Sequence, residues 1–75
     1  METSSAKFTP GIRVCVWIAQ RDDVAEGDGG TVVAVRKGAV GDSWYVDVIL
    51  DSGLRLGNYH EYAFVGEEDF RRARV

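Results

Sequence analysis

The chain has 75 residues, one cysteine and a formal net charge of −3 at pH 7. A chain of this length has room for one domain with one small core, and a single cysteine excludes an internal disulfide. The acidic balance disfavours a protein that holds nucleic acid through the phosphates, because such domains are normally basic.

Cellular location is indicated by the same totals. The longest apolar run, residues 14–19, is much shorter than the roughly 20 residues of a membrane-spanning helix, so we expect no membrane partner. No signal-like apolar segment lies near residue 1, and a lone thiol, Cys15, favours a reducing compartment. We therefore expect a cytoplasmic protein, with a nuclear location left open.

The first part of the chain predicts a leader and one strand. Residues 1–9 are polar without a period and are expected to be a flexible leader. Pro10-Gly11 is a turn signal that opens the folded domain, residues 10–75. Residues 12–18 alternate in the manner of a strand. The core face of this strand would carry Ile12, Val14, Val16 and Ile18, and Trp17 would point away from the core.

Two loops surround the second predicted strand. Residues 20–28 form an acidic loop that is short of apolar anchors, and Gly29-Gly30 leads into a strand at residues 31–36. Residues 37–42 contain two glycines and predict a second loop.

Residues 43–56 are typical of a β-hairpin. Two alternating segments flank Asp51-Ser52-Gly53, a three-residue loop in which Gly53 can adopt the left-handed conformation. The second arm would cover residues 54–59. In the first arm, one face would pack into the core and the other would point outward. The core face would hold Trp44, Val46, Val48 and Leu50, and the outward face Tyr45, Asp47 and Ile49.

The end of the chain predicts one helical turn at residues 67–70, with acidic residues at its N-terminus, and a short closing strand at residues 71–75. No segment carries a long apolar stripe of period 3.6, which disfavours ferredoxin-like and ubiquitin-like folds. An OB-fold remains an alternative. We expect an all-β chain, folded as a single small five-stranded barrel with a short helical turn near the C-terminus.

The order of short motifs resembles a known superfamily. The motifs are Gly11-Ile-Arg-Val14, Gly30-Thr-Val-Val33, Val48-Ile-Leu-Asp-Ser-Gly53 and Asn58-Tyr59. In this order they are similar to the SH3-like barrels that include Tudor, KOW and Mind-bomb-type domains. A Tudor-like relationship would imply an aromatic cage for a methylated Lys or Arg. A KOW-like relationship would imply contact with RNA or ribosomal partners.

The candidate binding residues are aromatic and acidic. Parity places Trp17 and Tyr45 away from the core, and Tyr59 and Tyr62 lie near the end of the second hairpin arm. Exposed aromatic side chains are typical of binding faces. Acidic residues of the loop at residues 20–28 would favour a cationic ligand. The predicted ligand-binding set is Trp17, Tyr45, Tyr59, Tyr62, Asp22, Asp23 and Glu26.

Catalytic and cofactor motifs are not found. His60 lies beside Glu61, but no nucleophile stands at a recognisable spacing, and no third group would orient a Cys15–His60 pair. The acidic loop lacks the EF-hand spacing, and residues 27–30 lack the Lys and Ser or Thr of a phosphate loop. We expect no enzyme activity, no cofactor and no metal.

These observations favour a non-catalytic SH3-like module that binds a protein or peptide, in particular a cationic or extended segment. One alternative is a structural or accessory subunit of a larger assembly, which includes self-association into a homo-oligomer. A third is a nucleic-acid-associated module that works through Lys37, Arg55 and the terminal arginines.

Overall fold

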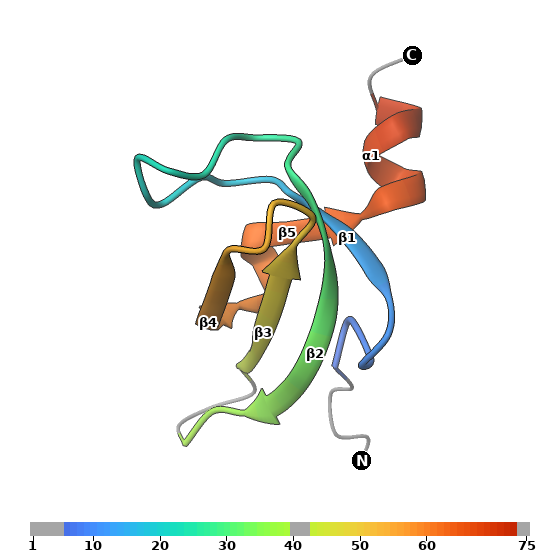
Figure 1. Ribbon diagram of the computed structural model, residues 1–75. Helices are drawn as coiled ribbons and strands as arrows, with labels where there is room; N and C mark the ends of the chain where they lie inside the picture. Colours follow the sequence, from blue (N-terminus) through green and yellow to red (C-terminus); the bar gives the residue numbers. More distant parts are fainter. Residues whose placement is uncertain (1–5, 40–42, 74–75) are drawn as a thin grey trace.

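The protein folds into one five-stranded antiparallel sheet followed by a short C-terminal helix (Figure 1). The computed structural model describes residues 6–39 and 43–73. Neighbouring strands in the sheet follow the order β4-β3-β2-β1-β5. The elements are β1 Arg13–Val16, β2 Gly29–Lys37, β3 Trp44–Leu50, β4 Arg55–His60, the 3-10 helix η1 Glu61–Ala63, β5 Phe64–Gly66 and α1 Glu67–Ala73.

The core lies on one side of this curved sheet and is built mainly from valines. β-branched side chains suit this role because they pack well on a pleated surface. Every strand contributes to the core, and β3 contributes at alternate positions. The largest fully buried side chains are Phe64, Leu56, Val14, Val16, Val32, Val46 and Val48.

The predicted β3–β4 hairpin is confirmed. The Leu50 N–H donates to the Leu54 carbonyl, and the Gly53 N–H donates to the Leu50 carbonyl, both at 2.8 Å. Gly53 has φ +98°, a conformation that costs other L-residues about 1–2 kcal/mol. Val46, Val48 and Leu50 are buried as predicted. Trp44, predicted on the same face, is only half-buried, and Asp47, predicted to point outward, is buried at 6% exposure because arginine side chains and a backbone N–H pair with its carboxylate.

Two irregularities bend the central strands. The β2–β3 register shifts between Val32 and Ala34, and the β3–β4 register shifts between Val46 and Val48. Bulges of this kind increase the local twist of a sheet. Gly30 allows β2 to approach β3 closely, because a Cβ there would stand 2.8 Å from the Ile49 carbonyl oxygen.

The predicted core face of the first strand is half wrong. Val14 and Val16 are buried, but Ile12 is 43% exposed and Ile18 is 52% exposed. Strand β1 has only four residues, so Ile18 belongs to the following loop. Cys15, on the opposite side of the strand, is also buried.

The segment before β1 contributes to the core. Phe8 is 5% exposed and packs in the core cluster, although residues 6–9 fall within the predicted leader of residues 1–9. Residues 1–5 lie outside the described residues. The folded domain therefore includes residues that precede Pro10.

The C-terminal prediction is wrong in its second half. The fifth strand is β5, Phe64–Gly66, which pairs with β1. Where a closing strand at residues 71–75 was predicted, the helix α1 continues to Ala73. Three acidic residues begin this helix and two arginines end it, which suits the helix dipole. Residues 74–75 lie outside the described residues.

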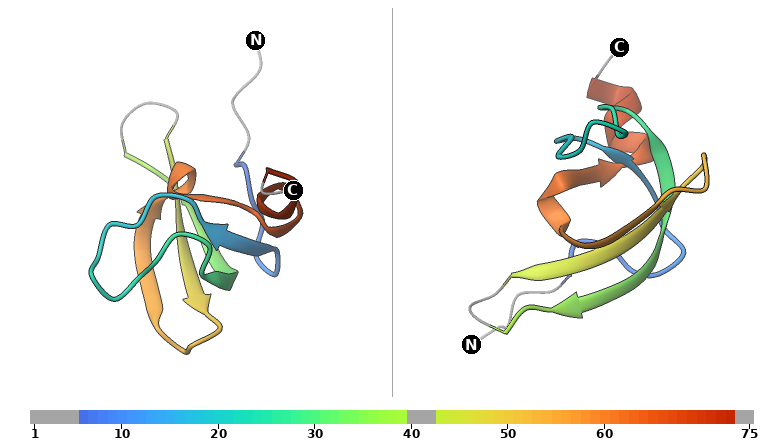
Figure 2. Two further views of the ribbon diagram at one scale, coloured as in Figure 1. Left: turned by 90° about the horizontal axis from the view of Figure 1, so that it is seen from above. Right: turned by 60° about the vertical axis from the view of Figure 1, so that its left-hand side comes forward.

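The β1–β2 loop contacts α1 at its base, where the Trp17 ring meets the Phe70 ring, and only its tip lies away from the helix. The tip of the loop projects on the side of β4, and α1 lies across from it (Figures 1 and 2). The loop was predicted to be short of apolar anchors, but Val24 anchors it: this side chain is 7% exposed and packs in the core.

Candidate functional site: an aromatic cluster

Three aromatic side chains meet where β3, β4 and η1 come together, and we name Tyr45, His60 and Tyr62 the aromatic cluster. Tyr45 pairs with His60 across the two strands. Their rings form an edge contact with centroids 5.5 Å apart, and the rings of His60 and Tyr62 stack at 5.1 Å. Tyr62 is 62% exposed, so the cluster offers an aromatic surface to solvent.

His60 also caps the 3-10 helix. The Tyr62 N–H donates to Nδ1 of His60 at 3.2 Å. This hydrogen bond requires an unprotonated Nδ1. The cap and the ring stack together hold Tyr62 against His60, so the geometry of the cluster is set by the backbone at the end of β4.

The other two predicted aromatic residues lie elsewhere. Tyr59 is half-buried, packs against the core and lies 6.0 Å from the Phe64 ring. Trp17 is 43% exposed and makes an edge contact with Phe70 of α1, with centroids 6.2 Å apart. Among the described residues, no ring contact joins Trp17 to a predicted tyrosine. The structure therefore brings together Tyr45 and Tyr62, but neither with Trp17.

The predicted acidic residues are exposed on the β1–β2 loop. Asp23 is paired with Arg21 at 2.6 Å, whereas Asp22 and Glu26 make no ion pair with any described residue. The Asp23 carboxylate, and to a smaller degree the Tyr59 hydroxyl, raise the pKa of Arg21.

The segment before β1 lies against the cluster. The Lys7 N–H donates to the Glu61 carboxylate at 2.7 Å, and Glu61 is only 5% exposed. The Lys7 ammonium lies 5.2 Å from the Tyr62 ring centroid and 5.3 Å from that of Phe8. It also donates to the Phe64 carbonyl at 3.4 Å.

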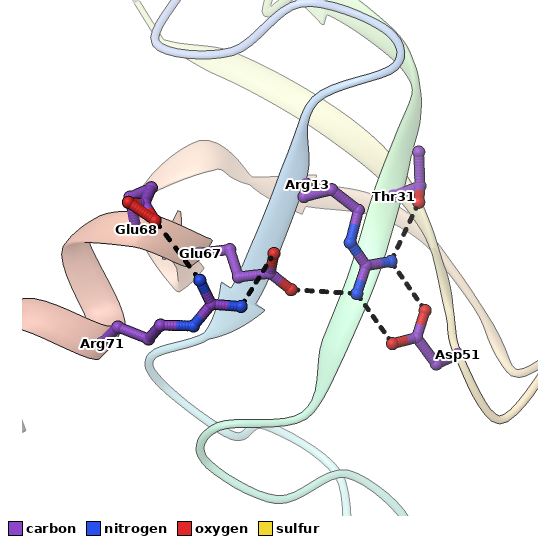
Figure 3. A network of polar contacts seen from close by, with 6 residues as sticks. All are labelled: Arg13, Thr31, Asp51, Glu67, Glu68 and Arg71. Atoms are coloured by element: carbon purple, nitrogen blue, oxygen red, sulfur yellow. Dashed lines mark hydrogen bonds and ion pairs between the residues drawn. The ribbon is translucent and has the colours of Figure 1, made fainter.

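A second polar network joins β1, the β3–β4 turn and α1 (Figure 3). The Arg13 guanidinium donates to both oxygens of Asp51, at 2.7 and 2.8 Å, and to Glu67 at 3.0 Å. The bond to Asp51, and to a smaller degree the bond to Glu67, raise the pKa of Arg13. In turn, the Arg13 guanidinium lowers the pKa of Asp51. Arg71 binds Glu67 and Glu68 on the other side. The donors and acceptors already satisfy one another, so this network has a structural role.

A third network surrounds Asp47, which is 6% exposed. Its carboxylate accepts bonds from Arg36 at 3.0 and 2.7 Å and from the Asn58 N–H at 2.7 Å. Together with Arg55, these partners hold the pKa of Asp47 at about 2. Asn58 has φ +60° at the β3–β4 irregularity. The hydrogen bond from its N–H to the Asp47 carboxylate stabilises the backbone in this left-handed conformation.

Two observations concern metal and thiol chemistry. The described residues contain no group of three or more His, Cys, Asp and Glu side chains that could hold a metal ion. The pKa of the Cys15 thiol is raised, mainly because the thiol is buried. A higher pKa leaves less of the reactive thiolate at neutral pH. In the part of the chain that is described, no helix has the length and apolar character needed to cross a membrane.

Comparison with family models, with curated proteins and with solved structures finds no significant match to this chain.

Sequence reasoning missed two members of the site. His60 is absent from the predicted ligand-binding set, and Lys7 lies within the predicted leader of residues 1–9. A signal was present for the first: residues 59–62 read Tyr-His-Glu-Tyr, with three ring-bearing side chains in four positions. No local signal places Lys7 beside Tyr62, because that contact spans more than fifty residues of chain.

Proposed function

We propose that this protein is a non-catalytic SH3-like module that binds an extended protein or peptide segment at the aromatic cluster. The observation that carries the proposal is the exposed stack of Tyr62 on His60, with Tyr45 at its edge. Tyrosine and histidine rings provide apolar area with polar tips, the combination found in binding hot spots. The five-stranded antiparallel sheet supports the barrel assignment, and the proposal extends it to a bent barrel closed through η1.

The ligand that fits this chain is cationic. The chain carries a net charge of −3, and Asp22 and Glu26 stand exposed without an ion pair to a described residue. A field of this sign accelerates the approach of basic segments. The faces of the cluster's tyrosine rings favour ammonium and guanidinium groups through cation–π attraction.

Amide NMR tests the proposal. A short peptide of alternating Lys and Ser is titrated into the protein, and a peptide of alternating Glu and Ser is the matched control. The proposal predicts saturable shifts at Tyr45, His60 and Tyr62 with the first peptide only. Shifts confined to α1, or equal shifts with both peptides, would contradict it.

Self-association is a second candidate, because several large apolar side chains are exposed. A copy of the chain, or a partner in an assembly, would cover them permanently. Sedimentation at several concentrations tests this: a single monomeric species up to high concentration argues against a homo-oligomer. The exposed residues are Ile12, Trp17, Ile18, Val33, Ile49 and Tyr62.

A nucleic-acid-associated role gains little support from the arginines. Arg71 and Arg72 pair with acidic residues of α1, and Arg55 faces the Asp47 carboxylate. Each arginine is thereby partly neutralised. A binding constant for single-stranded RNA that does not fall with added salt would contradict this role, since phosphate contacts make binding salt-dependent.

A further inference from the structure

The aromatic cluster already has a cationic neighbour from its own chain. The sequence contains only two lysines, Lys7 and Lys37, and each ammonium lies over an aromatic ring. Lys7 lies 5.2 Å from the Tyr62 centroid, and Lys37 lies 6.0 Å from the Trp44 centroid. Only the first of these rings belongs to the cluster.

The segment that carries Lys7 is held at both sides of this lysine. Phe8 is buried in the core, and the Lys7 N–H is bonded to the buried Glu61 carboxylate. The ammonium is directed to the Phe64 carbonyl and the Tyr62 ring. The segment thus combines an apolar anchor at Phe8, hydrogen bonds at Lys7 and a cation–π contact to Tyr62. A bound basic peptide makes contacts of the same three kinds.

From this geometry we infer that Lys7 competes, within the same chain, with a basic ligand for the face of the Tyr62 ring. The Lys7 ammonium lies over that ring, and a basic ligand must displace it. The inference rests on the proposed function and adds the ligand group that binds at Tyr62, a lysine ammonium. It also assigns the N-terminal segment a regulatory role at this site. Phe8 and the main-chain bond stay in place during the exchange, and only the Lys7 side chain moves.

The strength of the competition follows from the exposure of the contact. Lys7 is exposed and Tyr62 is 62% exposed. A cation–π contact at an exposed position changes a binding constant by about two- to five-fold. Removing the Lys7 ammonium should therefore strengthen the binding of a Lys-containing peptide by about that factor.

The test compares Lys7→Gln with Lys37→Gln, using the alternating Lys and Ser peptide and amide shifts to measure Kd. Both variants remove one positive charge from a lysine that lies over an aromatic ring, so they match in net charge. We expect Kd to fall about two- to five-fold in Lys7→Gln and to stay near the native value in Lys37→Gln. Lys7→Arg, which keeps a cation over Tyr62, should also stay near the native value.

The outcomes separate the inference from the proposed function. Saturable binding by the native protein with no gain in Lys7→Gln overturns the competition and leaves the function standing. An equal gain in both Gln variants also overturns it, because charge alone then accounts for the change. Absence of binding in all variants overturns the proposed function and the inference with it. In the free protein, a nuclear Overhauser effect should join the Lys7 side chain to the Tyr62 ring protons, and its absence would overturn the inference by itself.

Discussion

The Asp47 carboxylate, near the middle of β3, receives the Arg36 guanidinium of β2 in a two-pronged ion pair, with N–O distances of 3.0 and 2.7 Å. The same carboxylate accepts the Asn58 N–H of β4 at 2.7 Å. One buried acid therefore joins three strands beside the register shift of the β3–β4 pair. Asp47 lies on β3, two positions after Tyr45 of the aromatic cluster.

Acid should weaken the fold through Asp47. Its folded-state pKa, about 2, lies below the ordinary value of 3.8, so its contribution to stability is complete above pH ~4 and is lost as the pH falls toward ~2. Asp47→Asn should lower the free energy of unfolding by about 1–2 kcal/mol at neutral pH. Urea unfolding at a series of pH values measures this. A gap between the native protein and the variant that stays constant down to pH ~2 would contradict the assignment.

The β3–β4 turn should depend on Gly53. Gly53→Val forces a β-branched residue to φ near +98°, and we expect a loss of about 1–2 kcal/mol. A Cβ at this position meets no atom within 4 Å, so the loss comes from the backbone alone. Ser52→Val is the matched control in the same turn and should change stability little. Equal melting temperatures for the two variants would show that the turn is misassigned.

The N-terminal segment should be part of the cooperative fold. Phe8 is 5% exposed, whereas Ile18 is 52% exposed. Phe8→Ala should therefore cost about 3 kcal/mol in the free energy of unfolding, and Ile18→Ala less than about 0.5 kcal/mol. Chemical denaturation of both variants decides the matter: a loss from Ile18→Ala as large as that from Phe8→Ala would contradict the assigned core.

Arg13 should hold α1 in place. Lysine cannot donate to Asp51 and Glu67 from a planar fork, so Arg13→Lys should speed hydrogen exchange of the α1 amides and lower the melting temperature. Arg72→Lys is the control, because Arg72 makes one exposed contact within α1, with Asp69 at 3.7 Å. Unchanged α1 exchange in Arg13→Lys would show that Phe70 alone holds the helix.

Alternation and turn chemistry were sufficient to predict the central hairpin. The period of two in residues 44–50 predicts which of its valines are buried, and Gly53 marks the turn. The same logic failed at Ile12 and Ile18, because alternation does not show where a strand of four residues ends. It also failed after Gly66, where acidic residues followed by arginines at helical spacing continue the helix past residue 70.

The site was predicted less well than the fold. Parity indicated that Tyr45 lies outward, but the partner of Tyr45 depends on the β3–β4 register, which a bulge shifts. Trp17 contacts Phe70 because the chain after β5 continues as α1. The sequence predicts a strand for residues 71–75, so this contact could not be foreseen. Lys7 reaches Tyr62 through the packing of Phe8, a contact between the two ends of the chain that no local pattern encodes.

The aromatic cluster as a binding surface is tested most directly by peptide affinity in Tyr62 variants. With the alternating Lys and Ser peptide, Tyr62→Phe keeps the ring and should bind with a Kd near the native value. Tyr62→Ala removes the exposed ring and should raise Kd about tenfold, which corresponds to ~1.4 kcal/mol. Trp17→Ala, at an aromatic side chain outside the cluster, should leave Kd unchanged. A native Kd in Tyr62→Ala, or a loss in Trp17→Ala that exceeds the loss in Tyr62→Ala, would contradict the account.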